Sequence, residues 1–172
     1  MNKTVKSVVV LSLICLICAA LLGGVNMLTA PLIAEQERVA AEEALREVLP
    51  GGENFVDVDK LTYPNISADI DEIKRASNGG YVFKIITKGY NDGLVIMCGI
   101  DSEGKVTGAK PIASNETKHV EDSYGENFVG KDASGAGKVD TVSNSTETTA
   151  AYKNAILDAL KAYEIIKGGA GA

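Results

Sequence analysis

The fold is decided by two neighbouring segments, YVFKIITK at residues 81–88 and LVIMCGI at residues 94–100. The first is rich in β-branched and aromatic residues, which favour strands. The second is apolar throughout, which is typical of a strand buried on both faces. Turn residues at 78–80, 91–93 and 101–104 separate these segments from each other and from a third predicted strand at about 105–112. We therefore expect an antiparallel meander of three strands.

A closing helix is predicted after the meander. Apolar residues recur near a 3.6-residue period between Ala150 and Ile166, and we expect this stripe to pack on the sheet while residues 168–172 fray. The weakly patterned segment 58–75 adds only three modest core candidates, Ile66, Ile70 and Ile73. Together these elements predict an α+β domain. The expected helix stripe comprises Ala151, Ala155, Leu157, Leu160, Tyr163 and Ile166.

The first 50 residues are predicted to be a membrane anchor and a stalk. No Asp, Glu, Lys, Arg or His occurs between Ser7 and Ala34, a run longer than the roughly 20 residues that cross a bilayer. A cleaved signal peptide, the alternative, has an apolar core of only about 7 to 15 residues. We expect residues 1–34 to be a cytoplasmic N-terminus and transmembrane anchor, and residues 35–50 to be a helical stalk. Residues 51–172 would form the extracytoplasmic domain.

Charge sets the expected orientation. Lys3 and Lys6 precede the apolar run, whereas Glu35, Glu37 and Arg38 follow it, so the N-terminus is expected in the cytoplasm. The apolar run carries no carboxylate, lysine, arginine or histidine that would relay protons or coordinate a cation.

The formal net charge of the chain is -6, which argues against nucleic acid as a partner.

Cysteine usage adds little chemistry. Only Cys98 lies outside the anchor, so we expect no intrachain disulfide framework in the domain. Cys15 and Cys18 share one helix face, where they either pack as small apolar residues or form half of a metal or cluster site.

Hydroxyl groups crowd the segment DTVSNSTETT at residues 140–149, immediately before the closing helix. A helix beginning near Thr146 would leave its first N–H groups unpaired, and their dipoles favour a bound anion such as a phosphate. Two other interpretations use the same residues. Asn144 and Glu147 have the spacing of a capping box, and Asn144-Ser145-Thr146 is an N-glycosylation pattern that matters only in a eukaryotic secretory pathway.

Asp140, Ser143 and Thr146 also match the motif Asp-x-x-Ser-Gly-Ala-Thr of membrane-anchored FMN-binding proteins, which this segment resembles. That family includes the G subunit of the Rnf electron-transport complex and the C subunit of the sodium-pumping NADH:quinone reductase. Asn144 and Ser145 stand where the family has Gly and Ala. The resemblance implies that a flavin transferase joins FMN to Thr146 through a phosphoester, with Ser143 and Asp140 serving recognition or attachment.

The resemblance extends to the meander and implies further contacts with the flavin. Backbone groups at Ser145, Glu147 and Thr148 would hold the phosphate. In the family a Glu-Thr-Pro-Gly-Leu-Gly loop follows the third strand and shapes the pocket. Here Glu116-Thr117 continue as Lys118-His119-Val120.

Three smaller expectations concern the same part of the chain. The isoalloxazine ring would lie against apolar and aromatic side chains such as Tyr90 or Phe128, and residues 131–138 would be a flexible approach to the modified loop. His119, the only histidine, is expected to be an exposed loop residue and not a catalytic group or metal ligand, because no partner is spaced to work with it.

The function implied by the resemblance is a membrane-anchored electron relay with covalent FMN. It would serve an Rnf-type ferredoxin:NAD oxidoreductase that moves sodium ions or protons, with other membrane subunits as partners, and would not be a complete enzyme alone. The alternative is an anchored, cofactor-free extracytoplasmic adaptor or scaffold. A pilin-like subunit is disfavoured, because no prepilin-type cleavage glycine or early-helix glutamate follows the N-terminal lysines.

Overall fold

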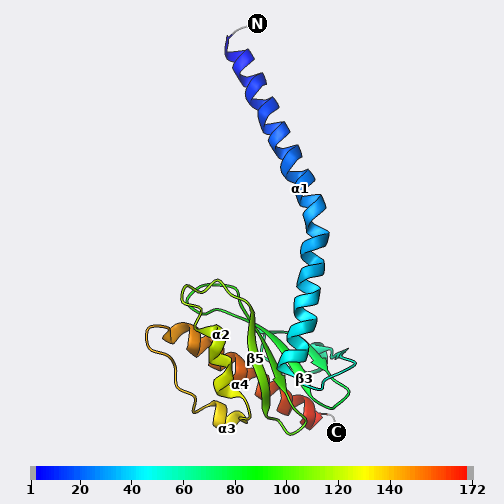
Figure 1. Cartoon of the computed structure of the whole chain (residues 1–172), viewed down its shortest axis with the longest axis vertical. Coiled ribbons are helices and arrows are strands. Elements are labelled where there is room, and N and C mark those ends of the chain that lie inside the picture. Colours follow the sequence, from blue (N-terminus) through cyan, green and yellow to red (C-terminus); the bar gives the residue numbers. More distant parts are fainter. Residues whose placement is uncertain (1–2, 170–172) are drawn as a thin grey trace. The chain divides into compact units, whose positions relative to one another are not determined.

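The computed structural model describes the backbone of residues 3–169 and the side-chain surroundings of residues 8–27, 29–30 and 43–169. It divides into two compact units, Met1–Ala40 and Ala41–Ala172. The first helix, α1 (Lys3–Val48), belongs to both (Figure 1). It ends at Val48, just before Pro50-Gly51-Gly52, which are residues that terminate helices.

The first unit carries an apolar helix. Residues Val8–Met27 have a mean hydropathy of 2.9, and they form the one candidate membrane span among the described residues. Large side chains such as Leu22 and Met27 are 73% and 80% exposed, so no protein surface covers them. Such a surface suits lipid. The side chains of Lys3, Lys6, Glu35, Glu37 and Arg38, on which the predicted orientation depends, lie outside the described residues.

The second unit is built on a five-stranded antiparallel sheet with its strands in chain order. The predicted meander is confirmed by the three strands β3, β4 and β5. The prediction missed the two other strands, β1 and β2. The strands are β1 (Val56–Asp57), β2 (Ile70–Arg75), β3 (Tyr81–Thr87), β4 (Leu94–Ile100) and β5 (Val106–Ala113).

Strand β2 escaped prediction because it lacks the period-two alternation of an ordinary strand. A bulge between Ile70 and Glu72 shifts its register against β3. The two buried residues, Ile70 and Ile73, are therefore three positions apart. The expectation that Ile66, Ile70 and Ile73 belong to the core is confirmed.

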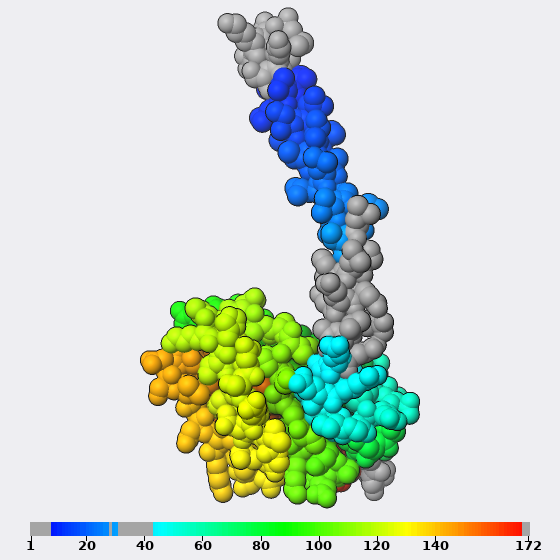
Figure 2. All heavy atoms as spheres, in the orientation of Figure 1, coloured from blue at the N-terminus to red at the C-terminus, as the bar shows by residue number. Residues whose placement is uncertain are grey.

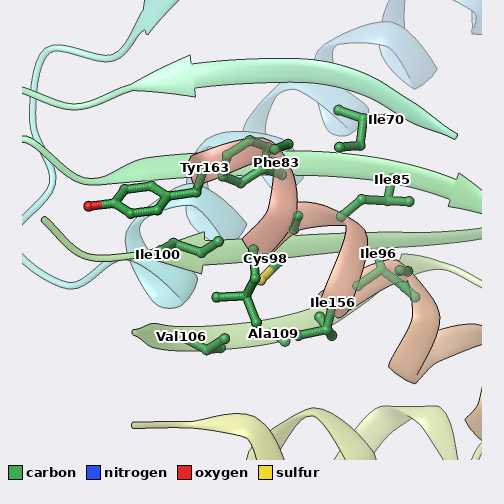
Figure 3. Close-up of a cluster of buried hydrophobic side chains, with 14 of the residues drawn as sticks. Ile70, Phe83, Ile85, Ile96, Cys98, Ile100, Val106, Ala109, Ile156 and Tyr163 are labelled. Atoms are coloured by element: carbon green, nitrogen blue, oxygen red, sulfur yellow. The ribbon is translucent and has the colours of Figure 1, made fainter. Parts of the chain in front are cut away.

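One face of the sheet packs against the closing helix, α4 (Thr146–Gly169). Figure 3 shows Phe83, Ile85 and Cys98 of the sheet beside Ile156 and Tyr163. Burial raises the pKa of the Cys98 thiol to about 12, so the thiol stays protonated and acts as a packing group. Of the expected stripe, Ala151 and Leu157 are only partly buried, and the remaining four residues are fully buried. Four further apolar residues of α4 that the stripe omitted are also buried: Tyr152, Ile156, Ala159 and Ala162.

The opposite face of the sheet packs against the end of α1. Leu45, Val48 and Leu49 form a second core cluster with Val82 and Met97. Successive strand residues point to opposite faces, so Val82 joins this cluster while its neighbour Phe83 joins the core under α4. The last turns of α1 are therefore part of the domain.

Two glycines allow this close approach of α1. A Cβ atom at Gly99 would lie 2.1 Å from the carbonyl oxygen of Val48, and one at Gly108 would lie 2.8 Å from the Val48 Cα. The Thr107 hydroxyl donates a hydrogen bond to the same Val48 carbonyl. This contact satisfies one of the carbonyl groups that a helix end leaves without an intrahelical partner.

Short helical segments fill the connection from β5 to α4. The segment 131–138, predicted to be a flexible approach, contains α3 (Ala133–Ala136), whose start is capped by Asp132 accepting a hydrogen bond from the Gly135 N–H at 2.8 Å. Two other short elements, α2 (Glu121–Tyr124) and η2 (Gly125–Phe128), follow β5. The short helix η1 (Lys60–Thr62) lies between β1 and β2.

We predict that Gly99→Ala destabilises the domain, because the added methyl group would collide with the Val48 carbonyl. The free energy of unfolding should fall by about 1–3 kcal/mol. Urea unfolding of the full chain in detergent, followed by circular dichroism, measures this change. Gly168→Ala is the control, since nothing lies within 4 Å of its Cβ position. Equal stabilities of the two variants would contradict the prediction.

Candidate functional site

A cavity of about 470 Å³ lies at the N-terminal end of α4. Its volume falls in the range of about 300–1,000 Å³ that is usual for ligand and cofactor sites. Of the predicted flavin-site residues, Asp140, Ser143 and Phe128 are absent from its wall. The lining residues are Tyr90, Glu116, Thr117, Lys118, Val120, Glu121, Asn144, Ser145, Thr146, Glu147 and Thr148.

Two segments far apart in the sequence form most of this wall: residues 114–121, after β5, and residues 144–148, at the start of α4. They meet where the Lys118 Nζ donates a hydrogen bond to the Asn144 carbonyl at 2.8 Å. Figure 2 shows yellow-green atoms, coloured as residues near 115–120, beside the orange atoms of residues near 145.

Helix α4 begins at Thr146, as predicted. The Thr146 side chain is exposed, and its hydroxyl makes only a long contact of 3.5 Å with the Val142 carbonyl. The first backbone N–H groups of a helix have no intrahelical partner. Thr146 therefore combines an accessible hydroxyl with neighbouring donors that suit phosphate oxygens.

Asn144 adopts a left-handed conformation with φ 65°. A helix cap residue is normally extended, so the capping-box interpretation of Asn144 and Glu147 is wrong. The left-handed region is the one that glycine enters freely and that asparagine enters more readily than other residues. Asparagine is therefore a suitable residue for this backbone conformation.

Glu116 is a buried residue of the cavity wall that connects three segments of the chain by hydrogen bonds. Its side chain is 6% exposed, and one carboxylate oxygen accepts a hydrogen bond from the Thr148 hydroxyl at 2.6 Å. The other oxygen accepts one from the backbone N–H of Asn91 at 3.1 Å. Gly89 leaves room for this arrangement, since a Cβ atom there would lie 2.4 Å from the Glu116 carboxylate. Glu116 thus joins the β3–β4 loop, the segment after β5 and helix α4.

Glu121 is a wall residue that the sequence interpretation missed. It is fully buried, and it accepts a hydrogen bond from the Ser114 hydroxyl. Its second oxygen has no hydrogen-bond partner in the described part of the chain. Alignment with the Glu-Thr-Pro-Gly-Leu-Gly loop would have drawn attention to Glu121, because it stands where that loop ends in glycine.

The remaining predicted residues separate into exposed and buried ones. The His119 side chain is 65% exposed, which confirms it as a loop residue. Tyr90 is 67% exposed and lines the cavity, whereas Phe128 is fully buried and does not. The expectation that Phe128 contacts a flavin is therefore wrong. Phe128 packs in the core against Tyr124, with ring centroids 5.3 Å apart.

Asp140 and Ser143 are exposed but lie outside the cavity wall. The backbone carbonyl of Asp140 accepts a hydrogen bond from the Tyr124 hydroxyl at 2.9 Å, which holds the start of the loop on the core. Burial, together with the nearby Asp140 charge, raises the pKa of Tyr124, so its hydroxyl remains a donor at neutral pH.

Comparison with known families identifies the domain. Residues 89–161 match the FMN-binding domain model, and every residue that lines the cavity lies within that range. The chain therefore contains an FMN-binding domain. Residues 1–48 also match the model of the RnfG N-terminal region.

Three relatives are each named as the G subunit of an ion-translocating oxidoreductase complex. The chain is 32% identical over 119 residues to the protein of Stutzerimonas stutzeri, which covers 65% of this chain and 52% of that protein. It is 25% identical over 190 residues to that of Shewanella baltica, covering 92% and 89%. It is 24% identical over 184 residues to that of Shewanella piezotolerans, covering 90% and 87%. The chain thus spans about half the length of the first of these relatives.

We predict that Thr148→Val destabilises this FMN-binding domain, because the buried Glu116 carboxylate would lose its hydroxyl donor. The free energy of unfolding should fall by about 1–3 kcal/mol. Thr148→Ser keeps the hydroxyl and serves as the control. Chemical denaturation of both variants measures the effect, and a valine variant as stable as the serine variant would show that the hydrogen bond contributes nothing.

A second prediction concerns the left-handed residue of the loop. Asn144→Val should lower stability by about 1–2 kcal/mol, because a β-branched side chain is strained at φ 65°. Asn144→Gly should match or exceed the stability of the unaltered chain. Thermal unfolding of the three proteins side by side tests this order, and indistinguishable valine and glycine variants would refute it.

Proposed function

We propose that this chain carries FMN on Thr146 and relays electrons within a membrane-bound, ion-translocating complex of the Rnf type. The observation that carries the proposal is the exposed Thr146 hydroxyl at a cavity formed entirely within the FMN-binding domain match. The names of the relatives and the match to the RnfG N-terminal region support the Rnf assignment.

The residues of the cavity fit a flavin with its phosphate at Thr146. In the attachment, a flavin dinucleotide would be the donor: the Thr146 Oγ1 would bond to the phosphorus next to the riboflavin part, the phosphoanhydride bond would break, the nucleoside monophosphate would leave and the hydroxyl proton would pass to solvent. Backbone N–H groups at the start of α4, around Ser145, Glu147 and Thr148, would hold the remaining phosphate oxygens. Glu116 and Thr117 would support the facing wall.

The exposed residues next to the cavity suit the attachment reaction. Asp140 and Ser143 lie outside the wall yet on the loop that leads to Thr146. They are therefore accessible to a flavin transferase, which would recognise them and catalyse the modification. Neither residue needs to contact the bound flavin.

FMN, when bound, supplies the redox chemistry, and the protein supplies position and water exclusion. No residue of the wall is assigned a catalytic role. The chain would accept an electron from one neighbouring subunit and pass it to another, in a complex that couples ferredoxin and NAD to the movement of sodium ions or protons. It would be an electron-transfer subunit and not a complete enzyme.

Membrane placement follows from α1. The span Val8–Met27 would anchor the chain in the bilayer, and the lysines before it would keep the N-terminus in the cytoplasm. In this arrangement residues 1–34 would be the N-terminus and anchor, and residues 35–50 would be the stalk, whose last turns pack on the sheet of the domain. Residues 51–172 would form the rest of the extracytoplasmic FMN-binding domain.

The test is covalent flavin on the denatured protein. The full chain is coexpressed with a flavin transferase as wild type, Thr146→Ala and Thr141→Ala, and each is examined by intact mass and by in-gel ultraviolet fluorescence. We expect one FMN on the wild type and on Thr141→Ala, whose exposed hydroxyl lies outside the cavity wall. We expect none on Thr146→Ala.

Other outcomes have distinct meanings. Flavin on Thr146→Ala would place the ester on another hydroxyl. The absence of bound flavin from all three proteins, covalent or reversible, would refute the electron-relay proposal and favour a cofactor-free anchored adaptor.

A further inference from the structure

Lys118 is the only basic residue among those that line the cavity in the described structure. Three carboxylates share the wall with it: Glu116, Glu121 and Glu147. Glu147 follows Thr146 directly, in the first turn of α4, where its negative charge already meets the positive end of the helix dipole. Apart from Lys118, the charged side chains of the wall are therefore all carboxylates, and an anionic group that binds at Thr146 lies near them.

The Lys118 ammonium group is held close to the attachment residue. Its Nζ donates a hydrogen bond at 2.8 Å to the carbonyl of Asn144, two residues before Thr146. An ammonium group has three N–H donors, so this contact leaves two of them for other acceptors. The Lys118 side chain is exposed, and an entering ligand can reach it.

Among the described residues, no ion pair within 4.0 Å joins Lys118 to Glu116, Glu121 or Glu147, although all four line the cavity. Both oxygens of Glu116 accept hydrogen bonds from other donors, Thr148 and Asn91. The Glu121 carboxylate is fully buried and bonds to Ser114. The positive charge of Lys118 thus remains free to pair with an anion at the mouth of the cavity.

We propose that Lys118 is the counter-charge for the flavin phosphate and makes the cavity selective for FMN over unphosphorylated riboflavin. This inference rests on the proposed function, because it takes FMN as the ligand. A hydrogen bond between an ammonium and a phosphate oxygen is charge-assisted and stronger than a neutral one.

A purely structural role for Lys118 makes a different prediction. If its bond to Asn144 only tied the two loops together, its loss would deform the whole cavity. Binding of riboflavin and FMN would then weaken alike, since both share the ring and the ribityl chain. A counter-charge acts on FMN alone, because riboflavin has no phosphate.

The experiment compares the two flavins on the full chain in detergent, carrying Thr146→Ala so that binding stays reversible. Affinities for FMN and riboflavin are measured by fluorescence titration with and without Lys118→Gln. We expect the preference for FMN over riboflavin to fall roughly tenfold in Lys118→Gln and to survive in Lys118→Arg. Lys161→Gln, an exposed lysine about four turns further along α4, should leave the preference unchanged.

An unchanged preference, or an equal loss of both affinities, would overturn the inference. If neither flavin binds reversibly, the ³¹P resonance of the wild-type protein loaded with covalent FMN replaces the titration. Lys118→Gln should then shift that resonance and Lys161→Gln should not; no shift in either would equally overturn it. Failure of the proposed function is distinct, since the wild type would then hold no flavin by either method.

Discussion

The burial of one face of α4 on the sheet is the constraint on which the rest of this domain depends. Residues such as Tyr152, Ile156 and Tyr163 are fully buried there, and removing that much apolar and aromatic surface from water is the main stabilising contribution available to the fold. Because the helix is held along its length, its first turn has a fixed position. Thr146 and its neighbouring N–H groups therefore form one wall of a preformed cavity.

The opposite wall depends on the buried carboxylate of Glu116. Glu116 bonds simultaneously to Thr148 of α4 and to the backbone of Asn91, so it links three segments that are far apart in the sequence. A buried carboxylate without donors would be costly, and these two hydrogen bonds offset that cost. Lys118 lies in the same wall, and two of the three N–H donors of its ammonium group are available to a ligand. The wall thus contains a buried carboxylate that connects the segments and an exposed ammonium group.

Helix α4 packs on one face of the sheet and the end of α1 packs on the other, and the two contacts differ in kind. On the α4 face the packing is ordinary side-chain interdigitation, as Figure 3 shows. On the α1 face the backbone itself comes close, and Gly99 and Gly108 make that possible. Ala44, Leu45 and Val48 are thus core residues of the domain and also lie in the last turns of the helix that carries the candidate membrane span.

The local sequence pattern was sufficient to predict the elements in which apolar residues form a continuous run or recur with a regular period. It predicted β3, β4, β5, the apolar span and the start of α4 at Thr146, because alternation, apolar runs and helical period are properties of neighbouring residues. It failed for β2, whose bulge breaks the alternation, and for Phe128, whose burial depends on distant partners. Only the tertiary structure brought Glu116 to Thr148 and Lys118 to Asn144, since these pairs are separated by 32 and 26 residues. Contacts over such distances are set by how the elements pack, which no local period encodes.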